Sequence, residues 1–163
     1  MIAALTLAAA AAAPAGACAL LSAGEIRRVQ GEEPKETKPS ERQAGGLVVQ
    51  QCFYLLPDFS RSVSLEVTRG EKVRDLWNER FGEKRGSGEK EREAGREDAE
   101  REERPERVRG IGEQAFWTGN PRLGGLYVLR KGAMLRLSVG GNDPKAKKVR
   151  RLTSLARFAL RRM

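Results

Sequence analysis

Histidine is absent from this sequence of 163 residues, and its absence removes the side chain that most often transfers protons near neutral pH. It also removes every Ser-His-Asp and Cys-His arrangement. Aspartate is scarce and most glutamates lie in one polar run, so a catalytic pair of carboxylates is hard to place on a rigid scaffold. No phosphate-binding loop, GxGxxG or nucleophile elbow occurs. We therefore expect neither an enzyme nor a cofactor, and an envelope enzyme that works without histidine ranks third among the possible functions.

Cysteine is nearly as scarce, because only Cys18 and Cys52 are present. Two thiolates without histidine cannot supply the four ligands of a usual metal site, so we expect no bound metal. In an oxidising compartment an even pair most simply forms a disulfide, here across the 33 residues from 19 to 51. Closing such a loop contributes about 3 to 4 kcal/mol of stability in the chain-entropy account. Alternatively, Cys18 carries a lipid, as in bacterial lipoproteins, and cannot pair with Cys52.

Charge is missing from the first 24 residues, which are dominated by alanine. An apolar run over residues 2–13, then Pro14 and the small residues 15–17, match the hydrophobic and cleavage regions of a secretory signal. We expect residues 1–17 to be a signal peptide and the rest to be exported, whether periplasmic, secreted or lipid-anchored at the cell envelope. A secretory signal usually has basic residues before its apolar run, but here they are missing and Arg27 and Arg28 follow the run instead. Two alternatives to a signal peptide therefore stay open: an alanine-rich tail of a cytosolic protein and a membrane span.

The segment after this leader has the patterns of a helix, a loop and two strands. Ser22 and Glu25 form a capping box that predicts a short helix, and Gly31 is placed to end it. Residues 32–46 are polar and contain two prolines and two glycines, so we expect a solvated loop. Strands are predicted over residues 47–55, which are rich in β-branched and aromatic side chains, and over residues 63–68, which alternate apolar and polar.

A second helix is predicted from Glu71 to Phe81, where apolar residues recur with helical spacing. Trp77 lies on this apolar stripe, so we expect it in the core rather than in a binding site. The next residues, 82–107, contain no valine, isoleucine, leucine or aromatic residue and many charges of both signs. We expect them to be a disordered charged insertion, because such a segment cannot bury a core.

Three strands and a helix follow the insertion. A glycine turn leads into an apolar strand within residues 108–117, and residues 126–130 and 134–139 flank a short hairpin turn. Pro144 is expected at the first position of the last helix. The predicted order is helix, two strands, helix, insertion, three strands, helix. It indicates a single α+β domain over residues 18–163, with an antiparallel sheet of about five strands and helices mainly on one face.

Short motifs in this chain resemble a known group of domains. They are CALLS at residues 18–22 followed by Glu25 and Ile26, a second cysteine in the first strand, and GIGEQAFW at residues 110–117 before a hairpin. This set resembles the small exported, often lipid-anchored, bacterial domains of unknown function with PsbP-like topology. The resemblance implies an exported domain whose early cysteine is a disulfide partner, and it brings no catalytic residues. The glycines of GIGEQAFW also fit a tight turn before a strand.

Positive charge is concentrated at the end of a chain whose formal net charge is +9. A basic helix can bind acidic lipid headgroups or nucleic-acid phosphates. Nucleic acid is disfavoured because the helix lacks an aromatic stacking platform, and a solvated face that aids solubility is the structural alternative. The candidates for contact with an anionic surface are Lys145, Lys147, Lys148, Arg150, Arg151, Arg157, Arg161 and Arg162.

These observations favour a non-enzymatic, exported cell-envelope domain that binds a ligand, a protein partner or an anionic surface through its sheet or its last helix. The alternative function is that of a cytosolic, basic protein associated with nucleic acid. That alternative requires the alanine-rich start to be an ordinary tail.

Overall fold

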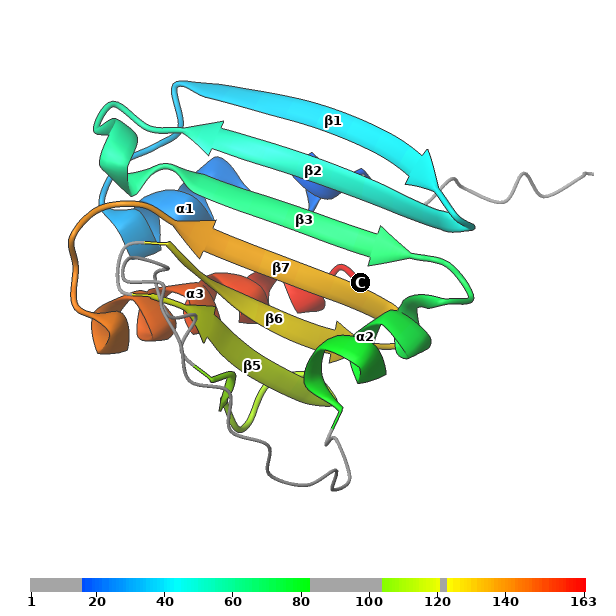
Figure 1. Ribbon diagram of the computed structural model, residues 1–163. Helices are drawn as coiled ribbons and strands as arrows, with labels where there is room; N and C mark the ends of the chain where they lie inside the picture. The colour runs from blue at the N-terminus through cyan, green and yellow to red at the C-terminus, as the bar shows by residue number, and fades with distance from the viewer. Residues whose placement is uncertain (1–15, 83–103, 121–122) are drawn as a thin grey trace, which may run out of the picture.

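The computed structural model of the chain describes residues 16–82, 104–120 and 123–163 (Figure 1). Within these ranges the protein is α+β, as predicted, with three α-helices and one antiparallel sheet of seven strands rather than about five. The helices are α1 (Ala23–Gln30), α2 (Val73–Phe81) and α3 (Lys145–Leu160), and two short 3-10 helices are η1 (Ala17–Ala19) and η2 (Phe59–Arg61). The strands are β1 (Glu36–Ala44), β2 (Leu47–Leu55), β3 (Val63–Arg69), β4 (Glu106–Arg107), β5 (Gln114–Gly119), β6 (Gly124–Arg130) and β7 (Ala133–Val139).

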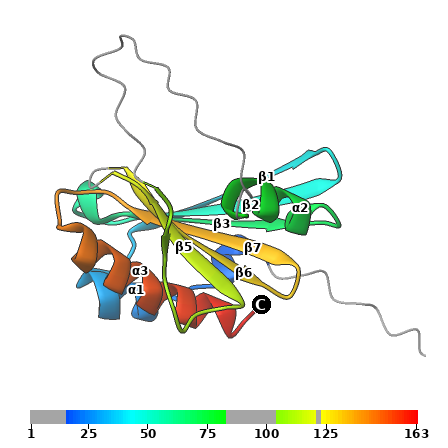
Figure 2. The ribbon, with the colours of Figure 1, turned by 60° about the horizontal axis from the view of Figure 1, so that its bottom comes forward.

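The sheet has the strand order β1-β2-β3-β7-β6-β5-β4 and two unlike faces. The helices α1 and α3 lie behind it in Figure 1, whereas α2 lies in front, and Figure 2 shows the same two layers from another side. We call the side that faces α1 and α3 the covered face, and the side that carries α2 the open face. Two of the three helices therefore share one face, in agreement with the prediction.

The main core lies between the covered face and α1, α3 and η1. Strand β3 shows why: Val63, Leu65 and Val67 are fully buried there, while Ser64 and Glu66 point to the open face. Leu152 and Leu155 of α3 pack onto this surface, as do other members of its apolar stripe. The alternation of period two in the strands and the period of 3.6 in the helix thus generate one continuous core.

A second, smaller core forms where α2 packs on the open face. Trp77 is 1% exposed, and its Nε1 donates a hydrogen bond to the Gln114 side chain at 2.8 Å. Phe81 stacks on Phe116 with ring centroids 5.0 Å apart and lies 5.3 Å from Tyr127. The prediction that Trp77 belongs to the core is confirmed.

The helix ends follow their local signals closely. Ser22 and Glu25 make both hydrogen bonds of the capping box, and Gly31 ends α1 with a left-handed φ of 86°. The start of α3 differs from the prediction by one residue, because Pro144 has an extended ψ of 145° and is the residue before the first turn. The preceding Asp143 does not cap the helix with its side chain and instead binds Lys147 and Arg151.

The prediction of a loop over residues 32–46 is wrong, because nine of them form the edge strand β1. All nine side chains are exposed, so no alternation of buried and exposed residues marks this strand. It is held by antiparallel pairing with β2 across a tight turn in which Gly45 and Gly46 have φ of 59° and 80°. A two-residue turn with positive φ matches the twist of a hairpin, and Pro39 is tolerated because β1 is an edge strand.

The charged insertion predicted over residues 82–107 also ends earlier than expected. Glu106 and Arg107 form the short strand β4, which pairs with Trp117 and Phe116 of β5. Residues 83–103 of that prediction lie outside the described residues, and so do residues 1–15 of the expected signal peptide.

Candidate functional site

The disulfide predicted between Cys18 and Cys52 is present, with a Cα–Cα distance of 5.0 Å. A sulfur atom used in this bond is not free to carry a lipid. The bond fixes η1 beneath β2, where the Tyr54 hydroxyl lies 3.3 Å from the carbonyl oxygens of Ala17 and Cys18. Burial raises the pKa of Tyr54 to about 12. Ala17 is only 3% exposed, so the packed domain already includes the last residue of the expected signal peptide.

The basic side chains of the last helix are largely engaged within the protein. Lys145 lies 2.6 Å from a carboxylate oxygen of Glu106 in β4, which ties the helix to the sheet edge. Arg162 binds both carboxylate oxygens of Glu25 at 2.9 Å and donates to the Leu20 carbonyl oxygen at 3.1 Å. Lys145 and Arg162 thus bind groups of the protein itself. Their ion pairs reduce the positive charge that this end of the chain can offer to an anionic surface.

Lys148 differs most from its predicted place on a solvated face, because it is completely buried. Its position four residues before the buried Leu152 puts it on the apolar stripe of the helix. Burial lowers the pKa of Lys148, whereas the charge of Asp143 opposes that shift. Arg150, Arg157 and Arg161 are exposed, and Arg161 lies over the Phe158 ring at 5.1 Å. Only part of the predicted cationic surface is therefore accessible.

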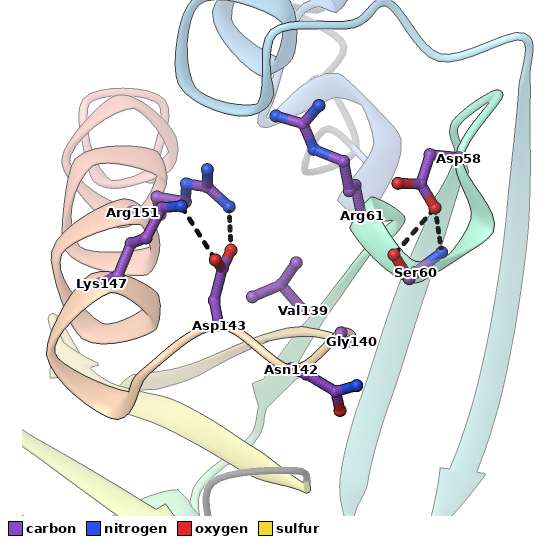
Figure 3. A pocket seen from close by; sticks show the side chains of 10 residues that line it. Asp58, Ser60, Arg61, Val139, Gly140, Asn142, Asp143, Lys147 and Arg151 are labelled. Carbon is purple, nitrogen blue, oxygen red and sulfur yellow. Dashed lines mark hydrogen bonds and ion pairs between the residues drawn. The ribbon is translucent and has the colours of Figure 1, made fainter.

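A polar pocket of about 530 Å³ lies beside the start of α3 (Figure 3). Asp143 is held between Lys147 at 2.8 Å and Arg151 at 2.6 Å. The hydrogen bond from Lys147, together with the charges of the neighbouring cations, lowers the pKa of Asp143. On the opposite wall, Asp58 accepts hydrogen bonds from the backbone N–H and the hydroxyl of Ser60. Both carboxylates of this pocket are thus satisfied by side chains or backbone of the chain itself.

The shape of this pocket is set by close backbone packing. Gly140 and Gly141 lie against Ser60, and a Cβ added at Gly140 would come 2.9 Å from the Ser60 carbonyl oxygen. The turn before α3 is thereby pressed onto η2 at the end of the sheet. We interpret the pocket as a structural junction, because Asp143 pairs with Lys147 and Arg151 and Asp58 is bonded to Ser60.

The GIGEQAFW motif is also used inside the fold. Gly110 and Gly112 have φ of 77° and 58°, which confirms the tight turn before a strand. Glu113 accepts a hydrogen bond from the Lys131 backbone at 2.6 Å and pairs with Arg74 at 2.9 Å. These contacts lower the pKa of Glu113, with the Arg74 hydrogen bond as the main cause. The motif therefore joins α2 to the turn between β6 and β7.

A different kind of hollow lies on the open face of the sheet, alongside α2. This open-face groove has a volume of about 420 Å³ and runs from β1 across β2, β3 and β7 to β6. Its apolar floor consists of Leu47, Val49, Leu76 and Met134, and its charged or polar side chains include Arg42, Glu66, Arg80, Tyr127 and Arg136. The groove thus combines an apolar floor with charged and polar groups in similar number, so it is suited to a ligand that has both an apolar and a charged part.

Three arginines give the open-face groove its charge. The Arg80 guanidinium lies 4.4 Å from the Tyr127 ring centroid, and the Arg136 Nε donates to the Tyr127 hydroxyl at 3.0 Å. Arg136 faces Glu66 across the sheet, but that carboxylate accepts a hydrogen bond from Gln51 instead. Among the described residues, none of the arginines 42, 80 and 136 has a carboxylate oxygen within 4.0 Å. Within the part of the chain that the structure describes, the groove therefore carries an excess of positive charge.

These groove residues were not singled out from the sequence. Arg80 had a readable signal, since it falls on the apolar stripe of α2 seven residues after Val73. Arg136 is the only charged residue of the mostly apolar strand β7, and it lies opposite Glu66 on the neighbouring strand. Arg42 carries no signal in the sequence, because residues 32–46 have the composition of a solvated loop.

Comparison with known proteins gives no guide to function, since no protein-family model, curated protein or solved structure matches this chain. In the described ranges, no three side chains of the metal-binding types come together. The helices of those ranges are also too short or too polar to cross a membrane.

Proposed function

We propose that this chain is a non-enzymatic binding domain of an exported, cell-envelope protein and that its ligand occupies the open-face groove. The observation that carries the proposal is a set of three arginines that have no acidic partner in residues 16–82, 104–120 and 123–163, set around an apolar floor in a hollow of about 420 Å³. That volume falls within the range of roughly 300–1,000 Å³ typical of small-ligand sites. Arg42 and Arg80 are exposed, and the contacts of Arg80 and Arg136 with Tyr127 leave most of their N–H donors unused.

Export is supported by the Cys18–Cys52 bond, because disulfides persist in oxidising compartments and are rare in the cytosol. The resemblance to exported domains of PsbP-like topology points in the same direction. The disulfide correspondingly disfavours the alternative of a cytosolic nucleic-acid-associated protein.

The sheet is a better candidate for binding than the last helix. Lys145, Lys147, Arg151 and Arg162 are engaged in ion pairs, and Lys148 is buried. An anionic surface would have to compete with these internal contacts, whereas the groove arginines need not give up an ion pair.

Location and processing can be tested by fractionating the native cells and measuring the intact mass of the chain. We expect the protein in the envelope or the medium, without its alanine-rich leader and two mass units lighter than the reduced form. A full-length cytosolic chain with free thiols would contradict the proposal.

Ligand binding can be tested with isotope-labelled protein whose disulfide is intact, by recording amide spectra with mixtures of small polar, apolar and charged compounds. Binding compounds should shift the signals of β7 and α2 around Met134 and Arg80, which line the groove. Shifts confined to α3, or no shifts with any compound, would argue against the groove as the site. The variant Arg80→Gln should weaken binding, and Arg157→Gln provides a control with the same charge change on the helix behind the sheet.

A further inference from the structure

We infer that the open-face groove binds an amphiphilic anion, namely an alkyl chain that ends in a carboxylate. This inference rests on the proposed function and specifies its ligand. It follows from three properties of the groove: the sign of its charge, the chemistry of its floor, and the occupation of its one aromatic ring.

The charge of the groove selects an anion. Among the described residues, the groove is lined by three guanidinium groups and one carboxylate, Glu66, whose oxygen already accepts a hydrogen bond from Gln51. A guanidinium has five N–H donors in a planar fork, and Arg136 spends one of them on the Tyr127 hydroxyl. The remaining donors match the two oxygens of a carboxylate, which arginine binds in a bidentate manner.

The floor of the groove selects an apolar tail. Leu47 and Leu76 are partly exposed, and Val49 and Met134 lie beside them with exposures of 8% and 6%. These are aliphatic side chains and a flexible thioether, which adapt to an irregular alkyl chain. A purely inorganic anion would bind the arginines but would leave the apolar floor in contact with water. It would therefore gain no free energy from burying that floor.

The aromatic ring of the groove is already occupied, which disfavours a planar aromatic ligand. Arg80 lies 4.4 Å and Phe81 lies 5.3 Å from the centroid of Tyr127. Stacking a ligand ring on Tyr127 would require displacing one of them. An alkyl chain needs no such platform, since it makes only non-directional contacts.

The inference can be tested by titrating the disulfide-intact protein with three compounds that carry similar unbranched alkyl chains and differ in head group: decanoate, decanol and decyltrimethylammonium. Amide spectra report both the site and the affinity. We expect decanoate to bind in the groove with a Kd on the order of 0.1–1 mM, which is typical of a ligand of about a dozen heavy atoms. Decanol should bind about tenfold more weakly, and the ammonium compound more weakly still.

Matched variants separate the head group from the tail. Arg80→Gln and Arg42→Gln should each weaken decanoate binding about fivefold and leave decanol binding unchanged, because they remove a charge-assisted hydrogen bond. Both arginines are exposed, so neither change threatens folding. Arg157→Gln, behind the sheet, should alter neither affinity. Added salt should weaken decanoate binding and spare decanol binding.

Several outcomes would overturn the inference. Equal affinities for decanoate and decanol, or unaltered decanoate binding in both groove variants, would show that charge plays no part. Groove binding by other compounds but not by decanoate would reject the alkyl carboxylate and leave the proposed function standing. If an acidic peptide shifts the groove signals and none of the small compounds does, the partner is a protein and the inference is wrong. If no compound of any class shifts the groove signals, the inference and the proposed function both fail.

Discussion

Reducing the Cys18–Cys52 disulfide should lower the free energy of unfolding by about 4 kcal/mol. The two cysteines are separated by 34 positions. For a loop of that size, the chain-entropy relation gives a loss of about 12.6 cal/mol/K in the unfolded chain, or about 3.8 kcal/mol at 25 °C. The native state should change little, because the Tyr54 hydroxyl still holds η1 through the Ala17 and Cys18 carbonyl oxygens.

The measurement is a pair of urea unfolding curves, with the oxidised protein and the protein kept reduced, and intact mass to verify the redox state. We expect a lower midpoint after reduction, together with a larger m-value because the unfolded chain expands. The double variant Cys18→Ala/Cys52→Ala should be somewhat less stable than the reduced protein, since Cys52 is fully buried. Unfolding free energies that agree within error in the two redox states would refute the reasoning.

Three further predictions concern packing, acid stability and processing. Gly124→Ala should destabilise by about 3 kcal/mol in thermal or urea unfolding, because the added Cβ would overlap the Trp117 ring, whereas Gly24→Ala has open space and should not destabilise. Asp143 has a lowered pKa in the folded protein, so its stabilising effect is complete above about pH 4 and is lost as pH falls further. Asp143→Asn should therefore cost about 1 kcal/mol near neutral pH and less at pH 2.5; an equal cost at both would contradict the assignment. Intact mass should show that the processed chain retains Ala17, and a chain that begins at residue 18 would contradict its role in the core.

Local signals in the sequence predicted most of the elements. The capping box of α1 and the turn at Lys131 and Gly132 each depend on a few neighbouring residues, so they can be identified without knowing the fold. Strand β1 could not be predicted from its own composition, since all its side chains are exposed and its backbone is ordered by β2. The pair Gly45 and Gly46 was the available clue, because two glycines directly before a strong strand are typical of a hairpin.

The candidate site was harder to predict because it depends on which strands are neighbours. The open-face groove takes Arg42 from β1 and Arg136 from β7, and two other strands separate them in the sheet. Their side chains line the same groove only because β7 pairs with β3, and this strand order is not visible in the sequence. Lys148 is the opposite case, because the sequence predicts it as a surface residue and the structure buries it. Its charge suggests exposure to solvent, but its position along the helix places it on the same side as the buried Leu152.

The contact between the two ends of the domain has a consequence for how the chain folds. Arg162 donates to the carbonyl oxygen of Leu20, 142 positions earlier, and α3 supplies one wall of the main core. Until the last 19 residues have been synthesised, only α1 and η1 cover this face of the sheet, so the apolar surface that α3 covers in the folded domain is exposed. The main core can therefore be completed, and Arg162 can reach Leu20, only after the end of the chain is present.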